Sequence, residues 1–233
     1  MKRVNRGNRK GMKNAGQKKL AEFEAKKLLA KYGIPVTKEL LAKNPQQAAA
    51  SAKMIGFPVA LKVQSPDILH KTDAGGVLLD LKNCDEVAKG FENIIKNAKA
   101  YKKDAKILGV LVQEMVTEGH QCIVGSKNDP QFGPVLMFGL GGIFVEVIKD
   151  VAFRIIPFER KDAKEMIAEI KGYVILKGVR GQKPVNFRAL EDALLRVSNM
   201  VWKNRKIEEL DINPLFVSEK GVKAADARII MSA

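Results

Sequence analysis

The chain is poor in the residues that build metal clusters and disulfide frameworks. Its 233 residues include two histidines, two cysteines and one tryptophan. Cys84 and Cys122 are too few for a disulfide framework and form no C-x-x-C pair, which favours a reduced, cytoplasmic protein. No apolar run is long enough to cross a bilayer, and the basic first residues lack the apolar segment of a secretory signal.

The familiar loops of nucleotide-binding and hydrolytic enzymes are also missing. The sequence has no G-x-x-x-x-G-K-[S/T] phosphate loop, no G-x-S-x-G elbow and no kinase H-R-D set. The run from Gly139 to Gly142 lacks the third glycine of a dinucleotide fingerprint. A nucleotide site in this chain therefore requires a different fold.

Acidic residues are absent from the basic start of the chain. The net charge is +15, from 41 Lys/Arg and 26 Asp/Glu, and residues 1–20 hold eight of the basic residues. Setting these eight aside leaves 33 basic against 26 acidic residues, so the body is only mildly basic. We expect residues 1–16 to be a solvated, flexible tail. The alternative is an RNA-binding accessory, although interleaved aromatic residues are missing from the tail.

Cap and turn residues divide the rest of the chain into helices and strands. The segment Asn44-Pro45-Gln46-Gln47 is typical of a helix start. Asn44 can cap the helix, Pro45 takes its first position, and the Gln47 side chain can accept a hydrogen bond from the backbone N–H of the cap residue. We expect helices at 17–32, 44–56, 83–99, 161–170 and 187–202. We expect extended segments at 34–41, 58–63, 76–81, 107–114, 121–126, 133–138, 143–148, 151–156, 207–212, 215–217 and 222–227. The prediction is an α+β fold, with a first lobe at 17–115 and a second lobe at 116–233.

One of the two histidines, His70, lies in the polar loop SPDILHKTDAGGV, between an apolar strand and a glycine pair. This loop is either a surface turn or a loop that handles a mobile phosphate. Lys62 lies in the preceding strand, where an unpaired buried charge costs several kcal/mol. It either discourages edge-strand aggregation or binds an anion.

The segment from Gln113 to Val116, followed by Glu118, lies where one lobe passes to the next. Extended backbone there can bond an adenine edge, and a carboxylate just beyond can accept ribose hydroxyls. The alternative is an ordinary strand end.

The C-terminal hairpin groups polar side chains on one face. A two-residue turn at 219–220 would place Asn213 opposite Asp226 and Asp211 opposite Arg228. An Asn oxygen beside an Asp carboxylate suits Mg²⁺, whose other ligands would be water and phosphate. The alternative is a polar face with an Asp–Arg pair, and a bulge at Gly221 would slip the register.

Together these pieces resemble the ATP-grasp domain of ADP-forming acyl-CoA synthetases, most closely the separate β subunit of the acetate–CoA ligase type. The matching stretches are PVALKVQSPDILHKTDAGGV, LVQEMV, DPQFGPVLMFGLGGIFVEVIKDVAFRIIP, LKGVRG, and ELDINPLFV followed by ADARI. They run in the family's order from about residue 20 to the last residues. The resemblance implies two α/β lobes with a nucleotide bound between them. It also implies that the CoA-binding half is a different polypeptide, the α subunit.

The resemblance assigns roles residue by residue. His70 matches a histidine proposed as a second phosphate carrier, on a mobile loop at 65–76. Asp211 matches an acidic position beside the arriving phosphohistidine. The implied residues are, for the nucleotide, Lys62, Gly75, Gly76, Glu114, Met115, Val116, Glu118 and Arg154; for Mg²⁺, Asn213 and Asp226; and for phosphoryl transfer, His70 and Asp211.

The family's reaction implies the substrates and the partner. Acyl-CoA, ADP and phosphate are converted reversibly into free acid, CoA and ATP, through histidine-bound phosphoryl groups. Mg²⁺ is the implied cofactor, with ADP and ATP as substrates. The implied partner is a CoA-binding α subunit that carries another phosphohistidine, in an α2β2 assembly.

The sequence departs from the family's pattern in two places. Gln121 stands where an acidic residue is usual, and Asn186 stands where aspartate is common. We interpret His120 and Cys122 as structural, because two ligands do not make a metal site. The alternatives are a succinyl-CoA synthetase β chain, which usually has a further C-terminal domain, or another ATP-grasp ligase. From a different class, the alternative is a basic RNA-associated protein.

Overall fold

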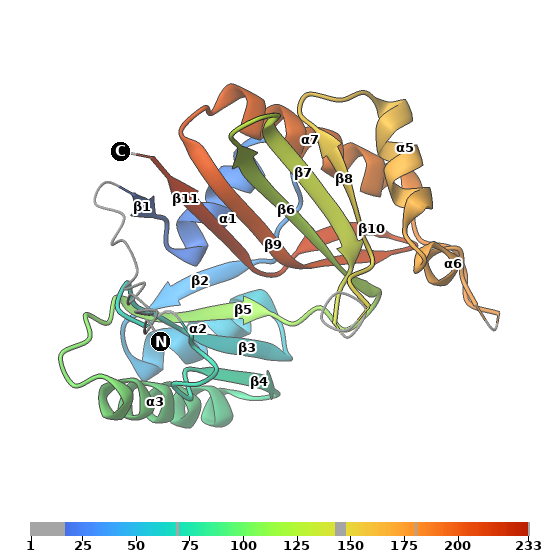
Figure 1. Cartoon of the computed structure of the whole chain (residues 1–233). Coiled ribbons are helices and arrows are strands. Elements are labelled where there is room, and N and C mark those ends of the chain that lie inside the picture. The colour runs from blue at the N-terminus through green and yellow to red at the C-terminus, as the bar shows by residue number, and fades with distance from the viewer. Residues whose placement is uncertain (1–16, 69, 143–147, 180, 233) are drawn as a thin grey trace, which may run out of the picture.

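Two antiparallel β-sheets, one above the other in Figure 1, organise the chain in the computed structural model. The structure describes residues 17–68, 70–142, 148–179 and 181–232. The expected tail at 1–16 and most of the expected strand at 143–148 lie outside the described residues. Among the helices of the described ranges, none is long and apolar enough to cross a membrane. The mixed helix and sheet content confirms the predicted α+β class.

The smaller sheet is assembled from the first half of the chain. Its strand order is β2-β5-β3-β4, with antiparallel pairing throughout. Its elements are β2 (Glu39–Ala42), α2 (Pro45–Ile55), β3 (Val59–Gln64), β4 (Val77–Leu81), α3 (Cys84–Tyr101) and β5 (Gly109–Glu114). Both helix starts are as predicted: the Asn44 side chain accepts from the Gln47 N–H at 2.8 Å, and Asn83 accepts from the Glu86 N–H at 2.9 Å.

The larger sheet comes mostly from the second half of the chain. Within the described residues it has seven strands, ordered β1-β11-β9-β6-β7-β8, with β10 paired to β9. Its strands are β1 (Lys18–Lys19), β6 (His120–Asp129), β7 (Gly133–Leu140), β8 (Val151–Ile155), β9 (Ile207–Ser218), β10 (Gly221–Ala224) and β11 (Ala227–Met231). The helices around it are α1 (Glu22–Lys31), α5 (Arg160–Glu169), α6 (Tyr173–Leu176) and α7 (Phe187–Lys203). The two segments expected at 207–212 and 215–217 form one strand, and α6 was not predicted.

The first described residues belong to the larger sheet. We expected one helix over 17–32, but β1 instead pairs with the end of β11, and α1 starts only at Glu22. Ala25 and Leu29 bury α1 in the core of the larger sheet. Because α1 packs there, the expected first lobe at 17–115 begins with residues that lie against the other sheet. We propose 39–114 as the extent of the smaller lobe.

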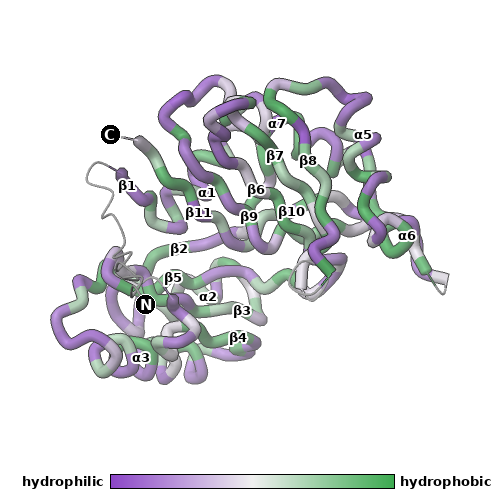
Figure 2. The backbone as a smooth tube through the Cα atoms, viewed as in Figure 1, coloured by the Kyte–Doolittle hydropathy of each residue, from purple (hydrophilic) through white to green (hydrophobic). Residues whose placement is uncertain are grey.

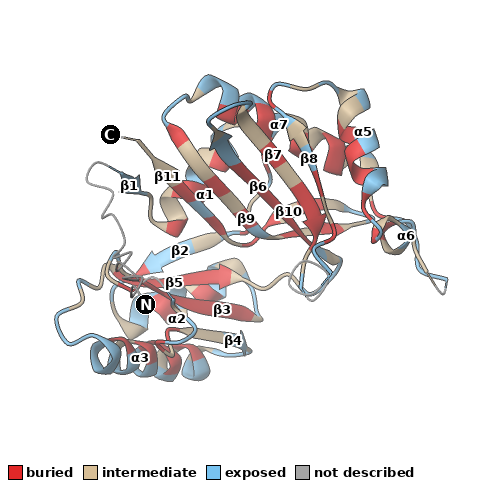
Figure 3. Cartoon of the chain, in the orientation of Figure 1, coloured by how far each residue is buried: buried red, intermediate tan, exposed pale blue. Residues whose placement is uncertain are grey.

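Each sheet has its own apolar core, and Figures 2 and 3 show apolar, buried residues concentrated along the strands. Alternation along β3 decides which residues enter the core. Val59, Leu61 and Val63 pack with α2 and α3, whereas Ala60 and Lys62 point to the opposite face of the sheet. That opposite face is turned toward the larger sheet, so its polar side chains line the space between the two sheets.

Candidate functional site

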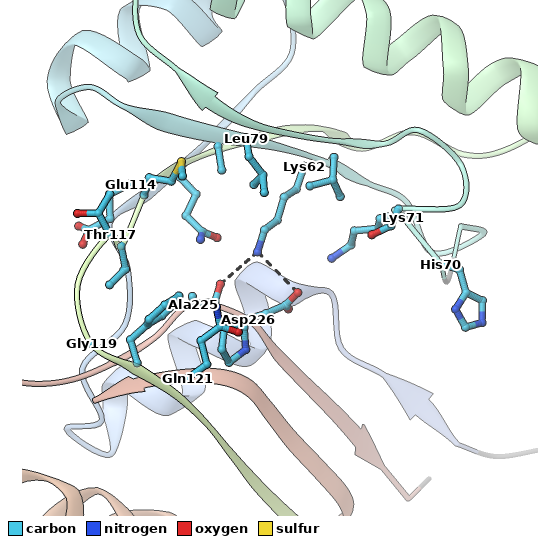
Figure 4. A pocket seen from close by; sticks show the side chains of 18 of the residues that line it. Lys62, His70, Lys71, Leu79, Glu114, Thr117, Gly119, Gln121, Ala225 and Asp226 are labelled. Carbon is cyan, nitrogen blue, oxygen red and sulfur yellow. Dashed lines mark hydrogen bonds and ion pairs between the residues drawn. The ribbon is translucent and has the colours of Figure 1, made fainter. Parts of the chain in front are cut away.

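A cavity of about 770 Å³ lies between the two sheets, with Lys62 projecting into it (Figure 4). Its walls come from β3, β4 and the end of β5 on one side, and from β6, β9 and the segment after β10 on the other. A second cavity of about 510 Å³ shares His70, Lys71 and Asp226 with the first. We call these the large and the small cavity.

Lys62 is buried and fully partnered in this structure. Its ammonium donates to Glu22 Oε1 at 2.8 Å and to the Ala225 carbonyl at 3.2 Å, and it lies 3.6 Å from Asp226 Oδ2. Its three neighbours are two carboxylates and a backbone carbonyl, whose oxygens all bear full or partial negative charge. The site therefore favours a cation at this point. Lys62 lies in the interior of the sheet, between β4 and β5, so the edge-strand alternative is wrong.

Glu22 is the residue of this site that sequence reasoning missed. It is the first residue of α1, its side chain is 2% exposed, and its oxygens contact Lys62, Lys71 and Lys26. Lys26 continues the network by bonding Glu39 and the Gln113 side chain. The only sequence signal is a Glu and a Lys four residues apart on a helix, which is also the pattern of an ordinary solvated pair.

The lysines keep Glu22 ionised. Burial by itself would raise the pKa of this carboxyl, but Lys62, Lys71 and Lys26 outweigh burial and hold the pKa at about 2. Burial by itself would lower the pKa of Lys62, but Glu22 and Asp226 raise it. Burial and the negative charge of Glu22 raise the pKa of Asp226. A cation added beside Asp226 would favour the ionised form of this carboxyl.

The loop between β3 and β4 brings His70 to the rim that the two cavities share. Its side chain is exposed, and its ring lies outside the group of side chains around Lys62 in Figure 4. The next residue, Lys71, reaches back to pair with Glu22. Because His70 lines both cavities, its imidazole is within reach of either one.

The predicted register of the C-terminal hairpin is confirmed. The strand β9 pairs with β10 and β11 across a turn at 219–220, and Asp211 lies opposite Arg228. The Asn213 N–H donates to the Asp226 carbonyl at 3.3 Å, so these residues also face each other. All four residues line the small cavity. Burial raises the pKa of Asp211, although Arg228 acts against this effect.

Asn213 and Asp226 fit Mg²⁺ as a partial set of ligands. Mg²⁺ is usually held by one or two protein carboxylates, with water and substrate phosphates completing its octahedron. Within the residues that the structure describes, no group of three or more His, Cys, Asp or Glu side chains is placed to hold a metal. A cation at this pair would therefore take its remaining ligands from water and substrate, and its charge would favour the ionised form of Asp226.

At the crossing from the smaller to the larger sheet, two of the three expected hinge residues use their backbone N–H groups within the protein. The Glu114 N–H donates to the Lys38 carbonyl at 2.9 Å, and the Met115 N–H donates to the Pro58 carbonyl at 3.3 Å. Val116 lines the large cavity, and no partner among the described residues occupies its N–H. Of the three residues expected at an adenine hinge, Val116 is the one with a free donor.

Two further residues after this crossing differ in their placement. Glu118 is turned away from the large cavity, because its carboxylate accepts from Lys220 Nζ at 2.6 Å and lines a separate cavity of about 410 Å³. Gln121 lines the large cavity, and its carbonyl accepts from the Gly141 N–H at 2.7 Å. Burial raises the pKa of the Cys122 thiol to about 12, which fits the structural interpretation of this cysteine.

Three residues expected at the phosphates, Gly75, Gly76 and Arg154, line neither the large nor the small cavity. A Cβ on Gly76 would stand 2.5 Å from Val63 Cγ1, so this glycine allows the loop to pack against β3. Gly75 has a positive φ of 59° and shapes the end of the loop. Arg154 pairs with Glu169 of α5 at 2.8 Å, on the outer strand β8. Their placement does not support the expected phosphate contacts.

Comparison with known proteins agrees with this two-sheet arrangement. The family model described as an ATP-grasp domain matches residues 11–231. The chain belongs to the ATP-grasp family. It is 48% identical over 217 residues to acetate–CoA ligase [ADP-forming] I subunit beta of Pyrococcus furiosus, an alignment that covers 93% of this chain and 94% of the relative. The predicted resemblance to ATP-grasp β subunits of this ligase type is therefore confirmed.

Solved structures of similar proteins share the ATP-grasp arrangement. Acetyl-coenzyme A synthetase 1 of Ca. Korarchaeum cryptofilum, in complex with coenzyme A and Ca-AMPCP, has a TM-score of 0.89 and 47% identity, and the match covers 92% of this chain and 93% of that chain. A selenomethionine form of the same synthetase was solved with coenzyme A and Mg-AMPPCP. Its phosphohistidine segment points towards the nucleotide binding site, and it has a TM-score of 0.81 and 44% identity over 91% of this chain and 92% of that chain.

Proposed function

We propose that this chain is the nucleotide-binding β subunit of an ADP-forming acyl-CoA synthetase, a ligase that interconverts acyl-CoA, ADP and phosphate with free acid, CoA and ATP. The main support is the large cavity between the sheets, where Lys62 projects inward and His70 stands at the rim. The identity to an acetate–CoA ligase β subunit supports the reaction type.

We propose one orientation for the nucleotide in the large cavity. Lys62, at the end shared with the small cavity, is proposed to contact the phosphates, since a buried ammonium is a strong point charge for them. The free N–H of Val116 is proposed to bind the adenine edge, with Glu114 and Met115 beside it. A ribose contact by Glu118 would require its pair with Lys220 to open.

Asn213 and Asp226 are proposed to hold Mg²⁺ with the nucleotide. When bound, the cation supplies positive charge beside the phosphates, which phosphoryl transfer needs more than covalent machinery. On the protein side, Asp226 also lies 3.6 Å from Lys62, so the two cationic positions share one carboxylate.

His70 is proposed to carry the phosphoryl group to and from the nucleotide. In the direction from ATP, the lone pair of an imidazole nitrogen forms a bond to the γ-phosphorus. The bond from that phosphorus to the bridging oxygen breaks, and ADP leaves with the electron pair. Imidazole suits this exchange because its neutral form is a nucleophile near pH 7. Asp211, on the wall of the small cavity, is proposed to lie beside the partner's phosphohistidine.

The acyl and CoA chemistry is proposed to reside on a separate α subunit, in an α2β2 assembly. The β-subunit relative supports an α-type partner. We propose the cytoplasm as the location, because both cysteines of the chain are free thiols in the structure.

Thermal unfolding of the full chain with and without Mg-ADP tests nucleotide binding. A ligand at about 100 times its Kd adds about 2.7 kcal/mol of stability. For a chain of this size, that gain corresponds to a Tm increase of about 5–10 °C. The absence of any shift at millimolar Mg-ADP would remove the proposed function. ATP formation from acetyl-CoA, ADP and phosphate should then require both this chain and its α-type partner.

A further inference from the structure

We propose that Glu22 and Lys71 form a latch that positions His70 for phosphoryl transfer, and that Glu22 acts as a positioning residue through Lys71. The inference rests on the proposed function of the same site. It concerns two residues that have no assigned role in the preceding scheme.

The first support is the geometry of Glu22. One carboxylate oxygen accepts from Lys62 at 2.8 Å, and the other accepts from Lys71. The carboxylate therefore bridges the strand lysine of the large cavity and the residue directly after His70. A buried carboxylate that holds two lysines presents negative charge and acceptor oxygens to them, as a phosphoryl group also would.

The second support is the charge balance of the network. It contains three lysines and three carboxylates: Lys26, Lys62, Lys71, Glu22, Glu39 and Asp226. The network is neutral as it stands, so a phosphate that arrives at Lys62 competes with one oxygen of Glu22, while the other oxygen keeps its contact with Lys71. Because this exchange replaces one anion by another, Lys62 does not need to lose its partner while the nucleotide binds or leaves.

The third support is the anchoring of the His70 loop. Its start is held by Asp67, which accepts from the Lys106 N–H at 2.7 Å, and its end is held by Gly76, whose carbonyl accepts from the Val63 N–H at 2.8 Å. Both of these anchors lie within the smaller-sheet body. The third anchor is the pair of Lys71 with Glu22. It is the one of the three that reaches α1, which packs on the larger sheet. Breaking this pair would leave the turn itself in place, since the Lys71 carbonyl accepts from the Gly76 N–H at 2.8 Å, but would remove the contact between this loop and α1.

Substitution of Lys71 separates positioning from nucleotide binding. Lys71 is partly exposed in a loop, so Lys71→Met is compatible with folding. We expect at least a tenfold slower phosphorylation of His70 by Mg-ATP, with the Kd for Mg-ADP changed less than threefold. Lys71→Arg keeps the charge and should restore most of the rate. Lys102→Met is the matched control, because it removes a lysine pair with Asp67 at the start of the same loop, at 3.4 Å, and should leave both values unchanged.

The full-length chain is incubated with radiolabelled Mg-ATP, and the rate of phosphorylation is measured as acid-sensitive label on His70. Calorimetry measures the Kd for Mg-ADP. A wild-type rate in Lys71→Met would overturn the latch. A parallel loss of ADP affinity and phosphorylation would also overturn it, because Lys71 would then bind the nucleotide directly. If the wild-type chain itself neither binds Mg-ADP nor labels His70, the proposed function fails, which is a different result from failure of the latch.

Discussion

Glu22→Gln removes the negative charge that contacts three lysines while it keeps the size of the side chain. The pKa of Glu22 lies at about 2, against an ordinary value of 4.5. Each pKa unit corresponds to about 1.4 kcal/mol, so ionised Glu22 stabilises the fold by about 3 kcal/mol at pH 7. The same figure follows independently from the usual cost, about 3–5 kcal/mol, of removing one partner from a buried ion pair.

The pH dependence of this effect has a definite sign. Because the folded pKa is below the unfolded one, the stabilisation is fully present above pH 4.5 and is lost as the pH falls toward 2. At pH 3 the unfolded carboxyl is almost wholly protonated while the folded one is still mostly ionised. The contribution of Glu22 at that pH falls to less than half of its value at pH 7.

Urea unfolding of wild type and Glu22→Gln at pH 7 and at pH 3, followed by circular dichroism and by the fluorescence of the single tryptophan, measures both quantities. Glu165→Gln is the control, since its pair with Lys161 is exposed and 3.9 Å long and should contribute less than about 0.5 kcal/mol. A difference between wild type and Glu22→Gln that is below 1 kcal/mol at pH 7, or equal at the two pH values, would refute the assignment of Glu22 as a buried counter-ion.

Three further predictions concern the neighbouring residues. Lys62→Met should weaken Mg-ADP binding at least tenfold in calorimetry, while Lys127→Met, which removes an exposed lysine, should not change it; equal affinities would exclude Lys62 from the phosphates. Asn213→Ala should raise the Mg²⁺ concentration needed for half-maximal ADP binding several-fold, and an unchanged Mg²⁺ requirement would place the cation elsewhere. Gly76→Ala should lower the unfolding free energy by about 1–3 kcal/mol, since its Cβ would meet Val63 at 2.5 Å, and an unchanged Tm would contradict this packing.

The sequence alone was sufficient where the determinants are local. The caps at Asn44 and Asn83 and the two-residue turn at 219–220 each depend on residues within a few positions of one another. The turn length sets the hairpin register, so the facing of Asn213 and Asp226 followed from it. The strand that contains Lys62 was also predicted, but its edge-strand and anion-binding alternatives stayed open until the structure placed β3 between β4 and β5.

Long-range packing decided the rest. Glu22 lies 40 residues from Lys62 and 49 from Lys71, so no local pattern distinguishes it from the solvated glutamates of other helices. The start of α1 depends on the pairing of β1 with β11, which lies at the other end of the chain. Local helix and strand propensities cannot predict such a long-range pairing. Arg154 was expected at the phosphates because its stretch resembles the family, but its position in β8 directs it to Glu169. The sequence by itself determined most of the elements, the hairpin register and the family. Only the tertiary structure decided which charges meet, because an ion pair is set by distance in space and by the burial that strengthens it.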